Sequence, residues 1–160
     1  MKCTHQKSSA LKRSVIAMGL FLGFVTPSYS VILETQGLGF GAFALRDNSS
    51  NHQIVIAPGG GITTDSEFVI IANGQPGSFD VSGFPDSTAL ILSAGNATLT
   101  SPLGGQPFSI VSPTFDPVAP VTDGLGNASF NLGATLQTSG TNGIYLDDNY
   151  SGTMTITVNF

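Results

Sequence analysis

Short apolar runs alternate with clusters of Gly, Pro, Asn, Asp and Ser along the chain after residue 30. No run of ten or more residues there places apolar side chains at helical spacing, whereas short runs bounded by turn-forming residues are typical of β-strands. About nine short strands at this spacing favour a two-sheet sandwich or a small barrel. The predicted strands lie near residues 38–45, 53–57, 67–72, 78–83, 88–93, 97–100, 107–112, 128–137 and 151–160.

Two of these segments alternate so regularly that each strand face can be assigned. Because successive side chains of a strand point to opposite faces, each segment buries its apolar row and exposes the polar one. The rows are Ala128, Phe130, Leu132, Ala134 and Leu136 in the first segment and Met154, Ile156, Val158 and Phe160 in the last. We expect a structural core that includes Phe40, Phe79, Phe130, Leu132, Leu136, Ile156, Val158 and Phe160.

The first predicted strand changes register in its middle. Leu38 and Phe40 fall on one face by simple alternation, but Phe43 and Leu45 fall on the other. A β-bulge adds one residue to a strand and so shifts the alternation by one. A bulge at Gly41, between the two pairs, would return all four apolar side chains to the core.

Residues 1–30 have the three-part pattern of a secretory signal peptide. A basic start is followed by an apolar stretch at 14–25, and Ser28 and Ser30 place small residues at the two positions that a signal peptidase reads. The apolar stretch is shorter than the roughly 20 residues that a membrane-spanning helix needs. We therefore predict export, with cleavage between Ser30 and Val31, leaving residues 31–160 as a single domain without a stable membrane span.

The charge of that domain restricts its partners. After residue 30 the chain has one basic side chain, Arg46, against ten Asp and Glu, and it has no Cys. A formal charge of −9 repels phosphate backbones and anionic lipid headgroups, which disfavours nucleic acid as a partner. Without disulfides, stability must come from buried apolar and aromatic side chains.

The sequence offers little for catalysis. His52 is the one His after residue 30, and it lies in a polar loop with no spacing to a Ser or Asp that would indicate a triad. We interpret His52 as a solvated loop residue. We expect no enzyme and no cofactor, and a hydrolase remains a third class of function to be tested.

The segment that begins at Asp147 is the best candidate for a metal. Asp147, Asn149 and Ser151 match positions 1, 3 and 5 of a calcium-binding loop, but the position that needs a bidentate Glu holds Val158. Turn chemistry alone explains Asp and Asn residues before a strand. We predict a turn rather than a metal site and keep these three residues as weak calcium candidates.

Five motifs in order along the chain resemble one bacterial family. They are Leu38-Gly39-Phe40-Gly41-x-Phe43, the segment Val55 to Gly60, the segment Pro76 to Gly83, Leu132-Gly133-Ala134-Thr135-Leu136, and the segment Tyr150 to Phe160. The chain is similar in this respect to the domain-of-unknown-function 4402 family of small exported β-proteins. It also more distantly resembles spore-coat-U-type and chaperone–usher pilus subunits.

These resemblances imply an all-β, immunoglobulin-like antiparallel sandwich of about 7–9 short strands. They imply no catalytic residues. We expect an exported structural or adhesion-type surface protein in the periplasm, on the cell surface or secreted, and its expected partners are other surface or pilus-type subunits. The alternative function is a secreted binding module for a small ligand, a sugar or calcium.

Overall fold

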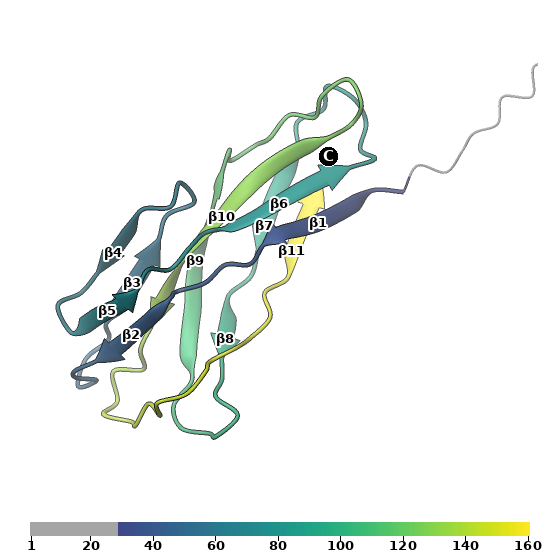
Figure 1. The fold of residues 1–160 in the computed structure, drawn as a ribbon. Helices are drawn as coiled ribbons and strands as arrows, with labels where there is room; N and C mark the ends of the chain where they lie inside the picture. Colours follow the sequence, from purple (N-terminus) through teal and green to yellow (C-terminus); the bar gives the residue numbers. More distant parts are fainter. Residues whose placement is uncertain (1–28) are drawn as a thin grey trace, which may run out of the picture.

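Eleven β-strands and no helix make up residues 29–160, the part of the chain that the computed structural model describes (Figure 1). All the strand pairs are antiparallel. The predicted signal peptide lies, up to residue 28, outside the described residues. The strands are β1 (Val31–Gln36), β2 (Ala42–Leu45), β3 (Gln53–Ile56), β4 (Ile62–Thr64), β5 (Phe68–Ala72), β6 (Gly77–Ser82), β7 (Ile91–Ala94), β8 (Ala97–Leu99), β9 (Phe108–Asp116), β10 (Ala128–Gln137) and β11 (Ile156–Asn159).

The long strand β10 is the centre of the larger sheet. Along one edge, its first half pairs with β6 and its second half pairs with β3. Along the other edge it pairs with β9. Strands β1, β4 and β8 extend the sheet outside β6, β3 and β9 respectively. The sheet therefore has seven strands, and β1 lies at one of its edges.

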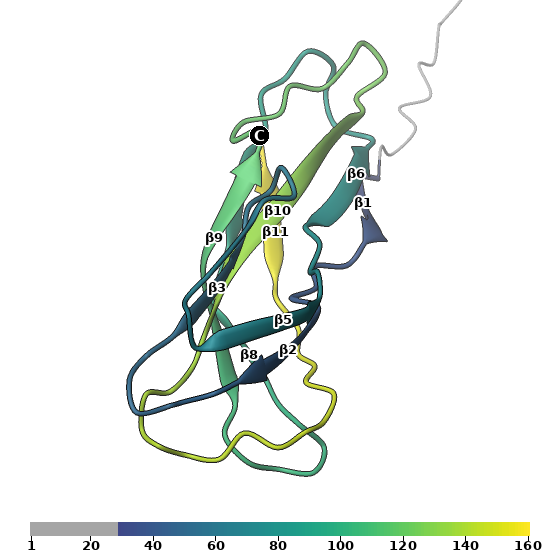
Figure 2. The same ribbon diagram turned by 60° about the vertical axis from the view of Figure 1, so that its left-hand side comes forward.

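Two separate strand pairs, β2–β5 and β7–β11, form the second layer. Side chains from β2 and β5 share one buried cluster with Leu136, and side chains from β7 and β11 share another with Phe130. Phe130 and Leu136 lie on the same face of β10 because their positions differ by an even number. Both pairs therefore cover the same face of the larger sheet. Figure 2 shows β2 and β5 crossing that sheet at one end, and the predicted all-β sandwich is confirmed.

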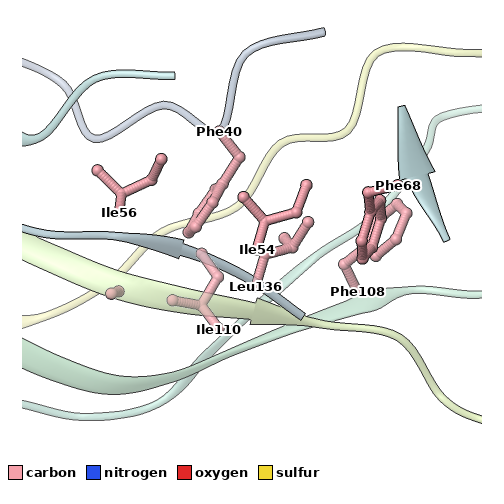
Figure 3. Packing of buried hydrophobic residues seen from close by; sticks show 8 residues of the cluster. Phe40, Ile54, Ile56, Phe68, Phe108, Ile110 and Leu136 are labelled. Atoms are coloured by element: carbon pink, nitrogen blue, oxygen red, sulfur yellow. The ribbon is translucent and has the colours of Figure 1, made fainter. Parts of the chain in front are cut away.

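The buried clusters supply the stability expected of a chain without disulfides. In the first, Ile54, Ile56 and Leu136 are fully buried, and Figure 3 shows Phe40 pointing toward Ile54 and Phe68 beside Phe108. The second surrounds Phe79 and Phe130. Full burial of one such side chain contributes about 1.5–3 kcal/mol. The complete buried sets are Phe40, Ile54, Ile56, Phe68, Phe108, Ile110, Ala134 and Leu136 in the first cluster and Phe79, Val81, Phe84, Leu90, Phe130 and Leu132 in the second.

The bulge predicted at Gly41 lies instead on the neighbouring strand. Ala42 is opposite Ala72 and Phe43 is opposite Ile70, so the extra residue is Ile71 of β5. Gly41 itself has φ +78°, which turns the backbone without adding a residue to the ladder. Phe40 is buried, and Leu38, Phe43 and Leu45 pack against the same cluster. All four apolar side chains therefore reach the core as expected, but the first strand contains no extra residue.

One expected core residue is not buried. Phe160 is 67% exposed, whereas Ile156 and Val158 of the same row are half-buried against the second cluster. The ladder of β11 with β7 ends at Asn159, so Phe160 extends beyond the sheet. Its ring keeps one edge-to-face contact, with Phe84 at a centroid distance of 5.7 Å. The prediction that Phe160 is a core residue was wrong for this reason.

Candidate binding groove

A groove of about 1340 Å³ lies where the second layer is divided. Residues 38–48, which include β2, form one wall without a break. The opposite wall is the chain that leads to β11, mainly residues 145–154. In Figure 1 this yellow segment runs below β1 and across from β2. The groove is therefore elongated, and its two walls are continuous segments of the chain.

The first wall is an edge strand held in place at both ends. β2 pairs with β5, and within residues 29–160 no second ladder is formed along its other edge. Before the strand, Gly39 and Gln75 exchange backbone hydrogen bonds of 3.0 and 2.7 Å. After it, the Arg46 N–H donates to the Glu67 carbonyl at 2.9 Å. An edge strand presents backbone N–H and C=O groups that can pair with another chain.

The second wall is extended chain fixed by isolated contacts. Thr100 and Ser151 exchange backbone hydrogen bonds of 2.9 and 3.0 Å. Tyr145 stacks on Phe108 with ring centroids 4.2 Å apart, and Tyr150 meets the same ring edge-on at 4.9 Å. The Tyr150 hydroxyl accepts a hydrogen bond from the Leu146 N–H at 2.9 Å. These contacts hold residues 145–151 near the core without making them part of a sheet.

The lining of the groove is apolar at its floor. Phe79, Ile110 and Leu132 of the larger sheet lie there, so the groove reaches down to both buried clusters. Side chains along its length keep part of their apolar surface exposed, and covering that surface would be favourable. These half-buried side chains are Leu38, Phe43, Leu45, Leu99, Tyr145, Leu146, Tyr150, Met154 and Ile156.

The rim of the groove is acidic. Glu34, Asp47, Asp147 and Asp148 line it against one cation, Arg46. Hydrogen bonds from the hydroxyl and backbone of Ser49 hold the pKa of Asp47 below its usual value. Hydrogen bonds from the Ser101 hydroxyl and the Asn149 backbone lower the pKa of Asp148 in the same way. Both carboxylates are therefore negative at neutral pH, and the rim favours neutral or cationic occupants.

The weak calcium candidates all lie on the second wall of the groove. Asp147, Asn149 and Ser151 are exposed, and Ser151 takes part in the backbone bridge with Thr100. The neighbouring Asp148 accepts hydrogen bonds from Ser101 and, at 3.4 Å, from the Leu103 N–H. Among residues 29–160 no group of three or more His, Cys, Asp and Glu could hold a metal ion.

We expect calcium to leave the thermal stability unchanged. Calcium needs 6–8 oxygen ligands, and a ligand bound by the folded state alone raises the melting temperature. Melting curves with and without millimolar calcium test this expectation, with Asp147→Ala as the diagnostic variant and Asp86→Ala as a control on a distant loop. A rise of several degrees that Asp147→Ala abolishes and Asp86→Ala retains would show that the turn is a metal site.

His52 lies outside the groove and is less solvated than the sequence suggested. Its side chain is 14% exposed and stands between two carboxylates, with Nε2 4.0 Å from Asp47 and Nδ1 3.8 Å from Asp65. Ser50 Oγ is 3.1 Å from Nε2. Ser, His and Asp thus come together, but 3.8 Å is too long for the hydrogen bond that orients a catalytic His. Asp65 instead accepts the Gln53 N–H at 2.7 Å, so this cluster joins two loops.

The sequence did not reveal the groove or the His52 cluster, because each is built from distant segments. The walls of the groove are about a hundred residues apart in the chain, and the loop of His52 meets Asp65 and Thr138 only through the fold. A signal for the first wall was present in the break of alternation at Gly41, which precedes a short strand. No comparable signal marks residues 145–154, which lack alternation before Met154.

Comparison with known proteins identifies a family. The model of the family described as "Domain of unknown function (DUF4402)" matches residues 31–160. No curated protein and no solved structure gives a match. Residues 29–160 contain no helix with the length and hydrophobicity of a membrane span. Since the match covers most of the chain, the protein belongs to the DUF4402 family.

Proposed function

We propose that this protein is an exported, non-enzymatic structural or adhesive component of the bacterial cell surface. The observation that carries the proposal is the groove between β2 and residues 145–154. Its recognition elements are an unpaired strand edge and partly exposed apolar side chains, which suit an extended polypeptide. An interaction of this kind joins protein surfaces and needs no reactive group.

Export is supported by two observations. The signal pattern ends at Ser30, and the family match begins at Val31. The negative charge of the domain repels nucleic acid and anionic lipid, which is compatible with a role in contacts between proteins. Nothing in the groove requires a cofactor for this role.

We expect the protein purified from its native host to begin at Val31 and to carry no lipid. Small residues at 28 and 30 direct a signal peptidase to the bond after Ser30. Intact-mass measurement, with sequencing of the first residues, tests this expectation. A chain that retains Met1, or an acylated Cys3, would contradict the export mechanism.

Surface location and adhesion test the role itself. Intact host cells should lose the protein on treatment with an external protease, while a periplasmic marker remains protected. A deletion strain should adhere less to surfaces or to other cells, and the gene supplied in trans should restore adhesion. A protein that stays protected, together with unchanged adhesion of the deletion strain, would reject the proposal.

The groove also supports the second candidate, a secreted binding module. Its volume is sufficient for a small ligand, since such pockets usually measure about 300–1,000 Å³. A panel of sugars added during thermal unfolding distinguishes the two functions. A ligand that raises the melting temperature, and whose effect is lost in Tyr150→Ala but kept in Phe160→Ala, an exposed aromatic outside the groove, would favour the binding module.

A further inference from the structure

The second layer has room for another strand, and β1 is a strand that little covers. The second layer is divided by the groove between β2 and residues 145–154, and β1 is an edge strand whose six residues are all exposed. We propose that β1 of one copy inserts into the groove of a second copy as an added strand. This inference rests on the proposed structural function and names its partner as the same protein.

The exposure of β1 is the first argument. Val31, Ile32 and Leu33 are 51%, 42% and 58% exposed. Aliphatic side chains grouped on an edge strand are a typical site of pairing with another chain. Because Val31 pairs with Ser82 and Leu33 with Asp80, these two side chains share the outer face with polar neighbours. Little apolar contact therefore holds β1 in its place on β6.

The second argument is the balance of hydrogen bonds. On its own chain, β1 uses one edge, in a ladder with β6 that is irregular between Glu34 and Gln36. In the groove it would lie between the free edge of β2 and the chain leading to β11, so both of its edges could pair. The inserted strand would also cover half-buried side chains such as Phe43 and Met154. Moving from β6 to the groove thus exchanges one partner for two.

The dimensions and composition of β1 also fit. Six extended residues span about 20 Å, which is longer than the four-residue β2 that would flank them. Val31 and Leu33 lie on one face of β1, and these two side chains would meet the apolar floor. Gly37 follows β1 directly and allows the arm to change direction before the buried Phe40.

Charge differs along this segment. Val31, Ile32 and Leu33 are uncharged and can enter an acidic groove without repulsion, whereas Glu34 of the same strand is repelled by Asp47, Asp147 and Asp148 on the rim. If cleavage occurs after Ser30, the α-amino group of Val31 adds a positive charge to the arm. The two domains still repel each other overall, so salt should promote the association by screening.

The contact is head-to-tail, because the arm and the groove are different surfaces of the chain. Such a heterologous contact can repeat from copy to copy and forms rings or open fibres. Association of copies through β1 therefore predicts species larger than a dimer, which grow with protein concentration.

A disulfide lock on β1 tests the proposal with the exported full-length protein. Leu33 and Asp80 are directly opposite in the β1–β6 ladder, so Leu33→Cys with Asp80→Cys can join them across the strands. The matched control is Val55→Cys with Thr63→Cys, an opposite pair in the β3–β4 ladder that leaves β1 free. Thiol titration establishes that each bond has formed, and light scattering measures the size of the particles.

We expect the wild type and the oxidised control to form concentration-dependent oligomers, the oxidised Leu33–Asp80 lock to remain monomeric, and reduction of that lock to restore the oligomers. A second variant, Leu33→Gln, should abolish the oligomers and change the melting temperature of the monomer little, since the side chain is exposed and the replacement places no charge opposite Asp80. The proposal is overturned if the wild type stays monomeric at all concentrations, or if the locked protein assembles as the wild type does. A monomeric protein that is still displayed on the cell surface and supports adhesion would reject this inference and leave the proposed function standing.

Discussion

Replacing Phe130 by alanine is expected to lower the free energy of unfolding by about 3–5 kcal/mol, the usual effect of removing a buried aromatic ring. Phe130 is 2% exposed and stacks on Phe79 with ring centroids 5.3 Å apart. Phe115 meets it edge-on at 5.8 Å. The loss is a large part of the roughly 5–15 kcal/mol that stabilises a domain.

Phe160→Ala is the matched control, because it removes the same ring from an exposed position. We expect this change to cost less than about 1 kcal/mol, as for most surface substitutions. Chemical denaturation of both variants, with the midpoint and slope compared, gives the difference. Equal losses for the two variants would mean that the end of β11 is more deeply packed than its 67% exposure indicates.

Gly41→Ala is expected to have the second large effect, of several kcal/mol, because two separate costs combine. With φ at +78°, Gly41 has a backbone conformation that residues with a side chain rarely adopt. A Cβ there would also lie 2.1 Å from the Ala72 carbonyl oxygen and 2.7 Å from Gly74 N. The alanine would therefore force apart the β2–β5 pair that forms one wall of the groove.

Two glycines of the 59–61 turn separate these costs. Gly60 has φ +89°, but a Cβ there meets no atom within 4 Å, so Gly60→Ala should cost about 1 kcal/mol from conformation alone. Gly59 has neither a positive φ nor a close neighbour, and its alanine variant should be nearly neutral. Thermal unfolding of the three variants should rank Gly41 well above Gly60 and Gly60 above Gly59. Any other order would show that the close approach of Gly41 to the segment after β5 does not hold β2 in place.

The sequence predicted the elements whose side chains alternate. Strand β10 was expected at residues 128–137 and has these bounds, because one of its faces is buried along its whole length and period 2 is unmistakable. Strand β11 was expected at 151–160 but covers Ile156–Asn159. Its alternation continues toward Thr153, where no neighbouring strand is present to pair with it.

Strand β1 was missed for the opposite reason. Its sequence has three aliphatic residues followed by polar ones, and it buries neither face, so side-chain periodicity carries no information about it. Its place in the sheet comes from the backbone ladder with β6 and from hydrogen bonds that the Thr35 and Gln36 side chains donate to the Ser78 and Pro76 carbonyls. The groove could not be predicted either, since a gap in a layer depends on which strands fail to meet. Which strands meet depends on how all eleven strands pair.

The continuity of β10 has a mechanical consequence. Phe130 and Leu132 belong to one buried cluster, and Ala134 and Leu136 belong to the other, so a single strand connects both halves of the interior. β10 also has neighbours on both edges for most of its length. Neither half can open without loosening the strand that it shares with the other. A force applied to β10 would therefore load both halves of the interior together, without a weaker half that opens first.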